Sequence, residues 1–175
     1  MNNVILKNII RFILLILLQV WVLDKVSFDG FIIPYVYVLF VLLLPLNINK
    51  SLLLLIAFGT GLTIDFFENT LGLHAAALVL LAFFRPGIIH LFFPRLEFVS
   101  GDEPGIIKLG LGGFLKYSFS LVFVFQLVIV FLETFSFRHF LTSLWYVVLG
   151  TLVTVVFIVV TDLIFLPPKN KIRKR

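Results

Sequence analysis

The stretch Gly59-Thr60-Gly61-Leu62-Thr63-Ile64-Asp65 places two glycines and a carboxylate inside an otherwise almost continuously apolar part of the chain. An aspartate at the centre of a membrane-spanning helix costs about 2.5–3.5 kcal/mol, so such residues usually face a bundle interior or a cavity. Gly59 and Gly61 remove side-chain bulk about one turn before Asp65, which allows another helix or a ligand to approach the backbone closely. The stretch therefore predicts either a helix-packing node or a binding site within a membrane.

The composition of the whole chain is that of a polytopic membrane protein. Of its 175 residues, 61% are hydrophobic and 13% are charged, and the mean hydropathy is +1.18. These values lie far outside the range of soluble domains and predict an all-α integral membrane protein. The net charge of +5 comes from basic residues that flank apolar runs, so we expect contact with the lipid bilayer and none with nucleic acid.

Six membrane-spanning helices fit the apolar runs, since each is long enough, or nearly so, for a hydrocarbon core of about 30 Å. The fourth is ambiguous because Arg85-Pro86-Gly87 interrupts it. Either the helix kinks there and Arg85 reaches toward the interface, or a short span is followed by an interfacial segment, which we favour. The expected spans are 4–23, 31–46, 51–67, 73–93, 114–135 and 139–166, followed by a basic cytoplasmic tail at 167–175.

The basic residues are distributed unequally between the two sides that these spans define. With both termini in the cytoplasm, 12 of the 14 Lys and Arg residues fall on the cytoplasmic side, and only Lys25 and Arg138 fall outside. Positive charge concentrates on the cytoplasmic side of membrane proteins, so this asymmetry favours an even number of spans in a cytoplasmic membrane. The candidate cytoplasmic contacts for a partner are Arg85, Arg95 and Lys108.

Asp65 and His74 are the one polar pair within the spans that suggests a site, together with Gly59, Gly61 and Gly72. A short turn joins the two residues on the same outer side. In a structural interpretation, Asp65 accepts hydrogen bonds from that turn or from the free amides of the fourth helix. In a functional interpretation, the pair forms the polar floor for a small ligand or a partner helix. No catalytic or metal-binding constellation is visible, so we expect neither an enzyme nor a cofactor.

Several short motifs together resemble one family, the bacterial rod shape-determining protein MreD. The likeness covers most of the chain in length, number of spans, and the order and spacing of its motifs. The motifs are Ile33-Pro34-Tyr35-Val36-Tyr37, Leu43-Leu44-Pro45-Leu46, Gly61-Leu62-Thr63-Ile64-Asp65, Leu71-Gly72-Leu73-His74-Ala75, Phe84-Arg85-Pro86 and Glu133-Thr134-Phe135-Ser136-Phe137.

This resemblance implies a six-helix bundle similar to the substrate-binding subunits of energy-coupling-factor transporters. It implies a non-catalytic inner-membrane scaffold or regulator of the elongation machinery (the elongasome), which builds peptidoglycan and maintains rod cell shape. The implied partners are the bitopic protein MreC, the MreB filament, the glycosyltransferase RodA and a class B penicillin-binding transpeptidase. The alternative, from another class, is a small-molecule-binding subunit of a transporter that uses Asp65 and His74.

Overall fold

The computed structural model of the chain describes residues 2–25, 33–96, 101–134 and 140–165. Within these residues every regular element is helical, as the composition predicts, and five of the helices are long and apolar enough to span a membrane. The expected external position of Arg138 and the expected basic tail 167–175 lie outside the described residues. The elements are α1 (Asn2–Trp21), the short 3-10 helix η1 (Leu23–Lys25), α2 (Val38–Leu42), α3 (Lys50–Glu68), α4 (Leu73–Phe92), α5 (Ile106–Thr134) and α6 (Phe140–Ile164).

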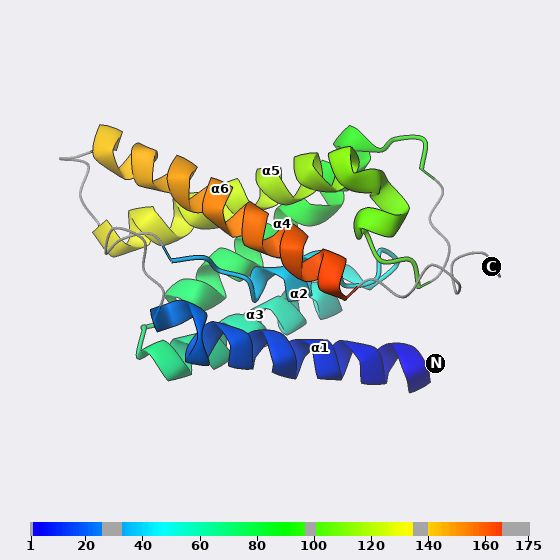
Figure 1. Cartoon of the computed structure of the whole chain (residues 1–175), viewed down its shortest axis with the longest axis horizontal. Coiled ribbons are helices and arrows are strands. Elements are labelled where there is room, and N and C mark those ends of the chain that lie inside the picture. The colour runs from blue at the N-terminus through cyan, green and yellow to red at the C-terminus, as the bar shows by residue number, and fades with distance from the viewer. Residues whose placement is uncertain (1, 26–32, 97–100, 135–139, 166–175) are drawn as a thin grey trace.

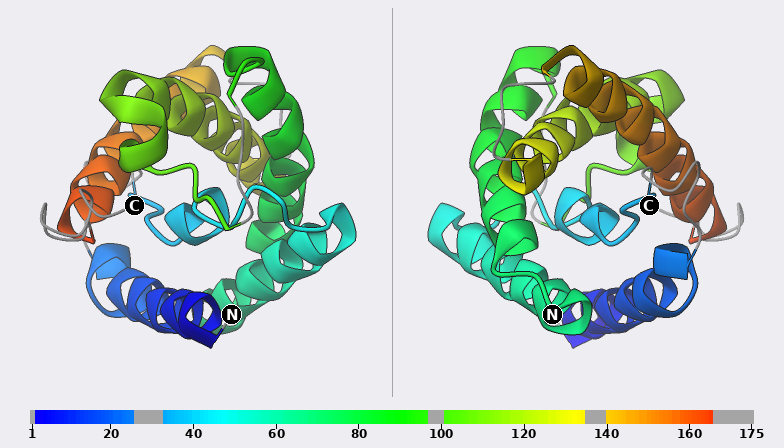
Figure 2. Two further views of the ribbon diagram at one scale, coloured as in Figure 1. Left: turned by 90° about the vertical axis from the view of Figure 1, so that its right-hand side faces the viewer. Right: turned by 90° about the vertical axis from the view of Figure 1, so that its left-hand side faces the viewer.

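The five long helices form a wall around a central segment that contains α2 (Figures 1 and 2). Helices α1, α3 and α5 run in one direction, and α4 and α6 return (Figure 1). We call the end where α1, α3 and α5 finish the distal end, and the opposite one the proximal end. Because α1 begins and α6 finishes at the proximal end, the chain crosses the bundle an even number of times.

The second crossing is the central segment, residues 33–46, and it is not the helix that the apolar run 31–46 predicts. Only Val38–Leu42 is α-helical. Nearly all of the segment is buried inside the wall, with side chains such as Val36 and Leu42 fully enclosed. Non-helical backbone at membrane depth is tolerated only where protein surrounds it and supplies hydrogen-bond partners. The prediction of a spanning helix at 31–46 was therefore wrong, although the chain does cross the bundle at this point.

Helix α4 continues through Pro86 to Phe92, so the expected break into a short span and an interfacial segment was wrong. The physical reason is the position of Arg85. Its side chain turns inward, with 2% exposed, and bonds to the central segment instead of reaching toward an interface. A helix held from inside in this way continues as a helix despite the amide that proline lacks.

Helix α5 begins at Ile106, eight residues before the predicted start of the fifth span at 114. A carboxylate oxygen of Asp162 on α6 accepts from the amide of Ile106 at 3.0 Å, which satisfies one free donor of the first turn. Gly110 interrupts the helix with a φ of 70°, a conformation that favours glycine. The connection between the predicted spans that end at 93 and begin at 114 is therefore shorter than expected, because α5 already begins at Ile106.

Candidate functional site

The backbones of α3 and α4 approach each other most closely at Gly61. A Cβ atom added to this residue would lie 2.3 Å from Cα of Ala75, a distance that carbon atoms do not reach. Only glycine allows the contact, which is how small residues let helices pack tightly in a membrane. Gly61 is therefore a packing residue, and it brings the end of α3 beside the start of α4.

Asp65 is 4% exposed and caps the start of α4 with both of its carboxylate oxygens. Oδ1 accepts from the backbone amide of His74 at 3.0 Å and from the hydroxyl of Thr70, and Oδ2 accepts from the amide of Ala75 at 2.9 Å. These are free donors of a helix N-terminus, where negative charge is also favoured. The structural interpretation of Asp65 predicted these contacts. The turn that permits them contains Gly72 at a φ of 85°.

His74 at the distal end is surrounded by aromatic and acidic side chains. Its ring centroid is 5.6 Å from that of Tyr35 and 6.0 Å from that of Tyr37. Nδ1 lies 3.5 Å from Oδ1 of Asp65, and Nε2 lies 3.5 Å from Oε2 of Glu68. The side chain is 2% exposed, so these neighbours and not solvent determine its charge and orientation.

Gly59 does not join the other predicted residues of the site. A Cβ added at this glycine would meet nothing within 4 Å, because Gly59 faces an opening beside α3. The opening is a groove of about 460 Å³ between α1 and α3, whose floor includes Phe40, Leu44 and Pro45 of the central segment. The groove is lined almost wholly by apolar atoms, and its walls are completed by Asn8, Ile9, Phe12, Ile48, Ile56, Gly59 and Thr60.

Arg85, an expected cytoplasmic contact, is instead the main hydrogen-bond donor to the central segment. Its Nη2 donates to the carbonyls of Leu42 and Leu44, and its Nε donates to the hydroxyl of Tyr117 at 2.9 Å. That hydroxyl in turn donates to the carbonyl of Leu42 at 2.9 Å. The network supplies hydrogen-bond donors to carbonyls of the central segment, which a regular helix would have satisfied with its own backbone amides. Arg85 is therefore a structural residue with no surface to offer a partner.

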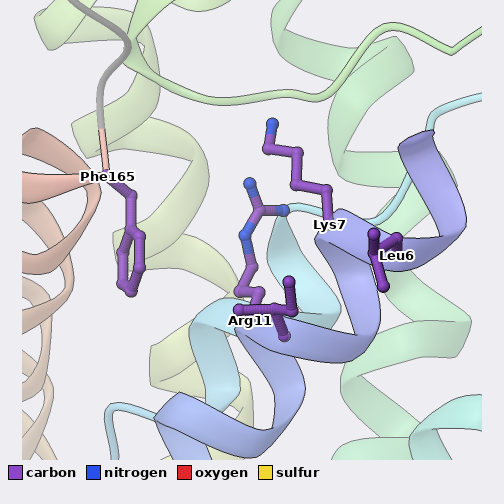
Figure 3. Close-up of a pocket in the computed structure, with 5 residues that line it drawn as sticks. Leu6, Lys7, Arg11 and Phe165 are labelled. Atoms are coloured by element: carbon purple, nitrogen blue, oxygen red, sulfur yellow. The ribbon is translucent and has the colours of Figure 1, made fainter.

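A second charged cluster ties α1 to the loop before α5 at the proximal end. Glu103 accepts from Nζ of Lys7 at 2.9 Å and from Nη2 of Arg11 at 2.8 Å. Both basic side chains line a crevice of about 360 Å³ between α1 and α6, beside Leu6, Ile10 and Phe165 (Figure 3). These ion pairs fix the proximal half of α1 against the bundle.

The two other expected cytoplasmic contacts lie in this proximal part of the chain. Lys108 pairs with Asp102 at 2.6 Å, and Arg95 is exposed just after α4. The structure therefore leaves Arg95 accessible, whereas Lys108 is partly engaged within the chain.

Sequence reasoning missed the side chains that bind the amides of the central segment. Oε1 of Gln19 accepts from the amide of Val36 at 2.9 Å, and the hydroxyl of Thr154 accepts from the amide of Tyr35 at 3.2 Å. Gln19 is fully buried although it lies in an apolar span. A single amide side chain in an apolar run could have indicated such an internal contact, because polar groups at membrane depth face the protein interior.

The fold and these contacts define a multi-pass helical membrane protein whose described polar groups mostly bond to one another. Within the described ranges, no group of three or more His, Asp or Glu side chains is arranged to hold a metal ion. Comparison with protein-family models, with curated proteins and with solved structures gives no match.

Proposed function

We propose that the protein is a non-catalytic membrane scaffold or regulator of the peptidoglycan elongation machinery, which maintains rod cell shape through contacts with other membrane subunits. The resemblance of several sequence motifs to the MreD family suggests this role and its inner-membrane location, with both termini in the cytoplasm. The observation that supports it best is the apolar groove between α1 and α3.

The groove has the properties that a partner helix requires. It is apolar, it lies between two long apolar helices, and Gly59 leaves room for a neighbouring backbone. Helices in membranes associate through close packing at small residues, because lipid gives no hydrophobic drive for helix contact. We therefore propose that the spanning helix of an MreC-like bitopic protein occupies this groove. Contacts with MreB, RodA and the transpeptidase are further parts of the same proposal.

The rival function, a ligand-binding transporter subunit, relies on Asp65 and His74. Both oxygens of Asp65 already accept hydrogen bonds within the chain, and its three donors leave little capacity for a ligand. Ligand pockets present convergent polar groups that are free to bind. The scaffold is therefore the better supported of the two proposals.

A matched pair of glycine substitutions tests the groove. Gly59 and Gly87 are both exposed, both helical and both free of atoms within 4 Å of an added Cβ, but only Gly59 lines the groove. Gly59→Leu should fill the groove and weaken co-purification of the MreC-like partner, whereas Gly87→Leu should not. Forcing bulk into a packed contact costs about 1–3 kcal/mol, or roughly 5- to 150-fold in affinity.

The chain contains no cysteine, so single cysteines can be introduced for cross-linking without background. A cysteine at Ile56 in the groove should cross-link to one in the partner helix, and a cysteine at Leu152 on the exposed face of α6 should not. Equal cross-linking from both positions would contradict the groove as the contact. Rod-shaped growth after complete depletion in the native host, with no paralogue present, would contradict the shape role.

A further inference from the structure

A small cavity lies at the proximal end between the start of α3, the second half of α4 and residues 46–48. Its volume is about 170 Å³. The residues that line it are buried on one side (Leu53, Arg85 and Ile89) and exposed on the other (Asn47, Lys50 and His90). The cavity therefore extends from the surface of the bundle to the buried side chain of Arg85.

The polar side chains that line this cavity include two cations and no anion. Arg85 and Lys50 are positively charged, and the ring of His90 and the amide group of Asn47 can also donate hydrogen bonds. Among the described residues, no Asp or Glu lines the cavity. The lining therefore combines positive charge with several donors that can converge on one acceptor.

One carboxylate lies on the neighbouring loop, but it is engaged elsewhere. The carbonyl of Asp102 accepts from the amide of Leu46 at 3.0 Å, which brings this loop close to the cavity. The carboxylate of Asp102 pairs with Nζ of Lys108 at 2.6 Å. Within the described part of the chain, the two cations of the cavity therefore have no counter-ion.

The guanidinium group of Arg85 is the buried one of these two charges. Nε donates to the hydroxyl of Tyr117, and Nη2 donates to the carbonyls of Leu42 and Leu44. These acceptors carry no net charge, and no described residue accepts from Nη1. A buried charge is costly unless an opposite charge and further hydrogen bonds compensate it. An anion in the cavity would supply both the missing charge and an acceptor for Nη1.

We propose that this cavity binds a phosphate group, which Arg85 holds from the inside and Lys50 and His90 hold at the rim. The planar fork of a guanidinium group matches the oxygens of phosphate, and a lysine adds a point charge. The volume equals about five water molecules at roughly 30 Å³ each, which accommodates one phosphate group with a few waters. It is below the roughly 300 Å³ at which pockets for drug-sized molecules begin.

Binding of radiolabelled inorganic phosphate to the full chain tests the site by equilibrium dialysis in a maltoside detergent, which contains no phosphate. Lys50→Gln should weaken binding by up to about 5-fold, the range for an exposed charge pair. Lys116→Gln is the matched control, because Lys116 is also an exposed helical lysine but does not line the cavity. No saturable binding to the native chain, or equal weakening by both substitutions, would overturn the proposal.

Arg85→Met tests the buried side of the cavity. It should weaken phosphate binding by about 10- to 150-fold, which corresponds to the loss of one charged hydrogen bond. If this variant does not fold, the comparison of Lys50→Gln with Lys116→Gln decides. Glu97 lies outside the described residues, and Glu97→Gln should bind phosphate as the native chain does. Tighter binding by Glu97→Gln would show that this carboxylate balances the cavity, and the proposal would fail.

The phosphate group can come from free phosphate or from the headgroup of an anionic lipid. Phosphatidylglycerol added to the micelles should compete with radiolabelled phosphate if the headgroup enters the cavity. Oleate gives the micelles negative charge without a phosphate group, so it should compete less. Equal competition by both lipids, or none by either, would leave free phosphate as the source. A cavity that holds only water would bind neither ligand.

Phosphate binding is independent of the groove between α1 and α3. Gly59→Leu should lose the MreC-like contact and still bind phosphate as the native chain does. Normal partner binding by a chain that binds no phosphate would reject the phosphate site alone.

Discussion

Replacing Tyr117 by phenylalanine removes one oxygen atom from the buried network around the central segment. The hydroxyl accepts from Nε of Arg85 at 2.9 Å and donates to the carbonyl of Leu42 at 2.9 Å. The ring itself is 0% exposed, and phenylalanine has nearly the same shape, so the substitution creates almost no cavity. The change therefore measures the hydrogen bonds and little else.

The cost can be worked out from the two bonds that are lost. The neutral bond to Leu42 contributes about 0.5–1.5 kcal/mol, and a hydrogen bond from a charged group about 1.5–3 kcal/mol. The carbonyl of Leu42 keeps a longer contact to Nη2 of Arg85 at 3.4 Å, which compensates in part. We expect Tyr117→Phe to lower the free energy of unfolding by about 2–4 kcal/mol.

A double-mutant cycle with Arg85→Met shows whether the charged bond is responsible. Methionine keeps an unbranched stem but has no donor, so removing the hydroxyl in this background strands no buried charge. Tyr117→Phe should then cost about 1–3 kcal/mol, which is the cost of leaving the buried carbonyl of Leu42 without a donor, because the bond from the charged guanidinium is no longer there to lose. Unfolding in mixed micelles of mild detergent and dodecyl sulfate gives the four free energies. An equal cost in both backgrounds would refute the reasoning.

Two further substitutions test the junction between α3 and α4. Asp65→Ala should destabilise the bundle by about 1–3 kcal/mol for each buried amide left without an acceptor, at His74 and Ala75. Asp65→Asn should cost about half as much because one oxygen remains, and a stable but inactive Asn variant in shape complementation would reject the structural role. Gly61→Ala should lower the amount of folded protein in the membrane sharply, because its methyl group would collide with backbone atoms of α4. Gly59→Ala is the matched control and should be tolerated, so equal loss from both would disprove the close approach.

The local features of the distal junction were predictable because they are encoded within a short stretch of chain. Asp65 and the amides of His74 and Ala75 are only nine and ten residues apart, and a turn signal lies between them. A carboxylate followed by a turn and a new apolar run leaves few partners other than the free amides of the next helix. For Gly59 the sequence did not tell that the residue lines the groove instead of joining Asp65 and His74, because a glycine spacing does not show which face of a helix meets a neighbour.

The sequence by itself determined the class of the protein and the approximate ends of its long helices, because apolar length and flanking charge set membrane spans. Only the tertiary structure decided the form of the central segment, the burial of Arg85 and the groove between α1 and α3. Hydropathy is the same for an apolar run that faces lipid as a helix and for one that is enclosed by protein. The two cases differ in where the backbone finds its hydrogen-bond partners. In the enclosed segment these partners come from residues far away in the sequence, such as Thr154, which lies 119 positions from the amide of Tyr35 that it binds.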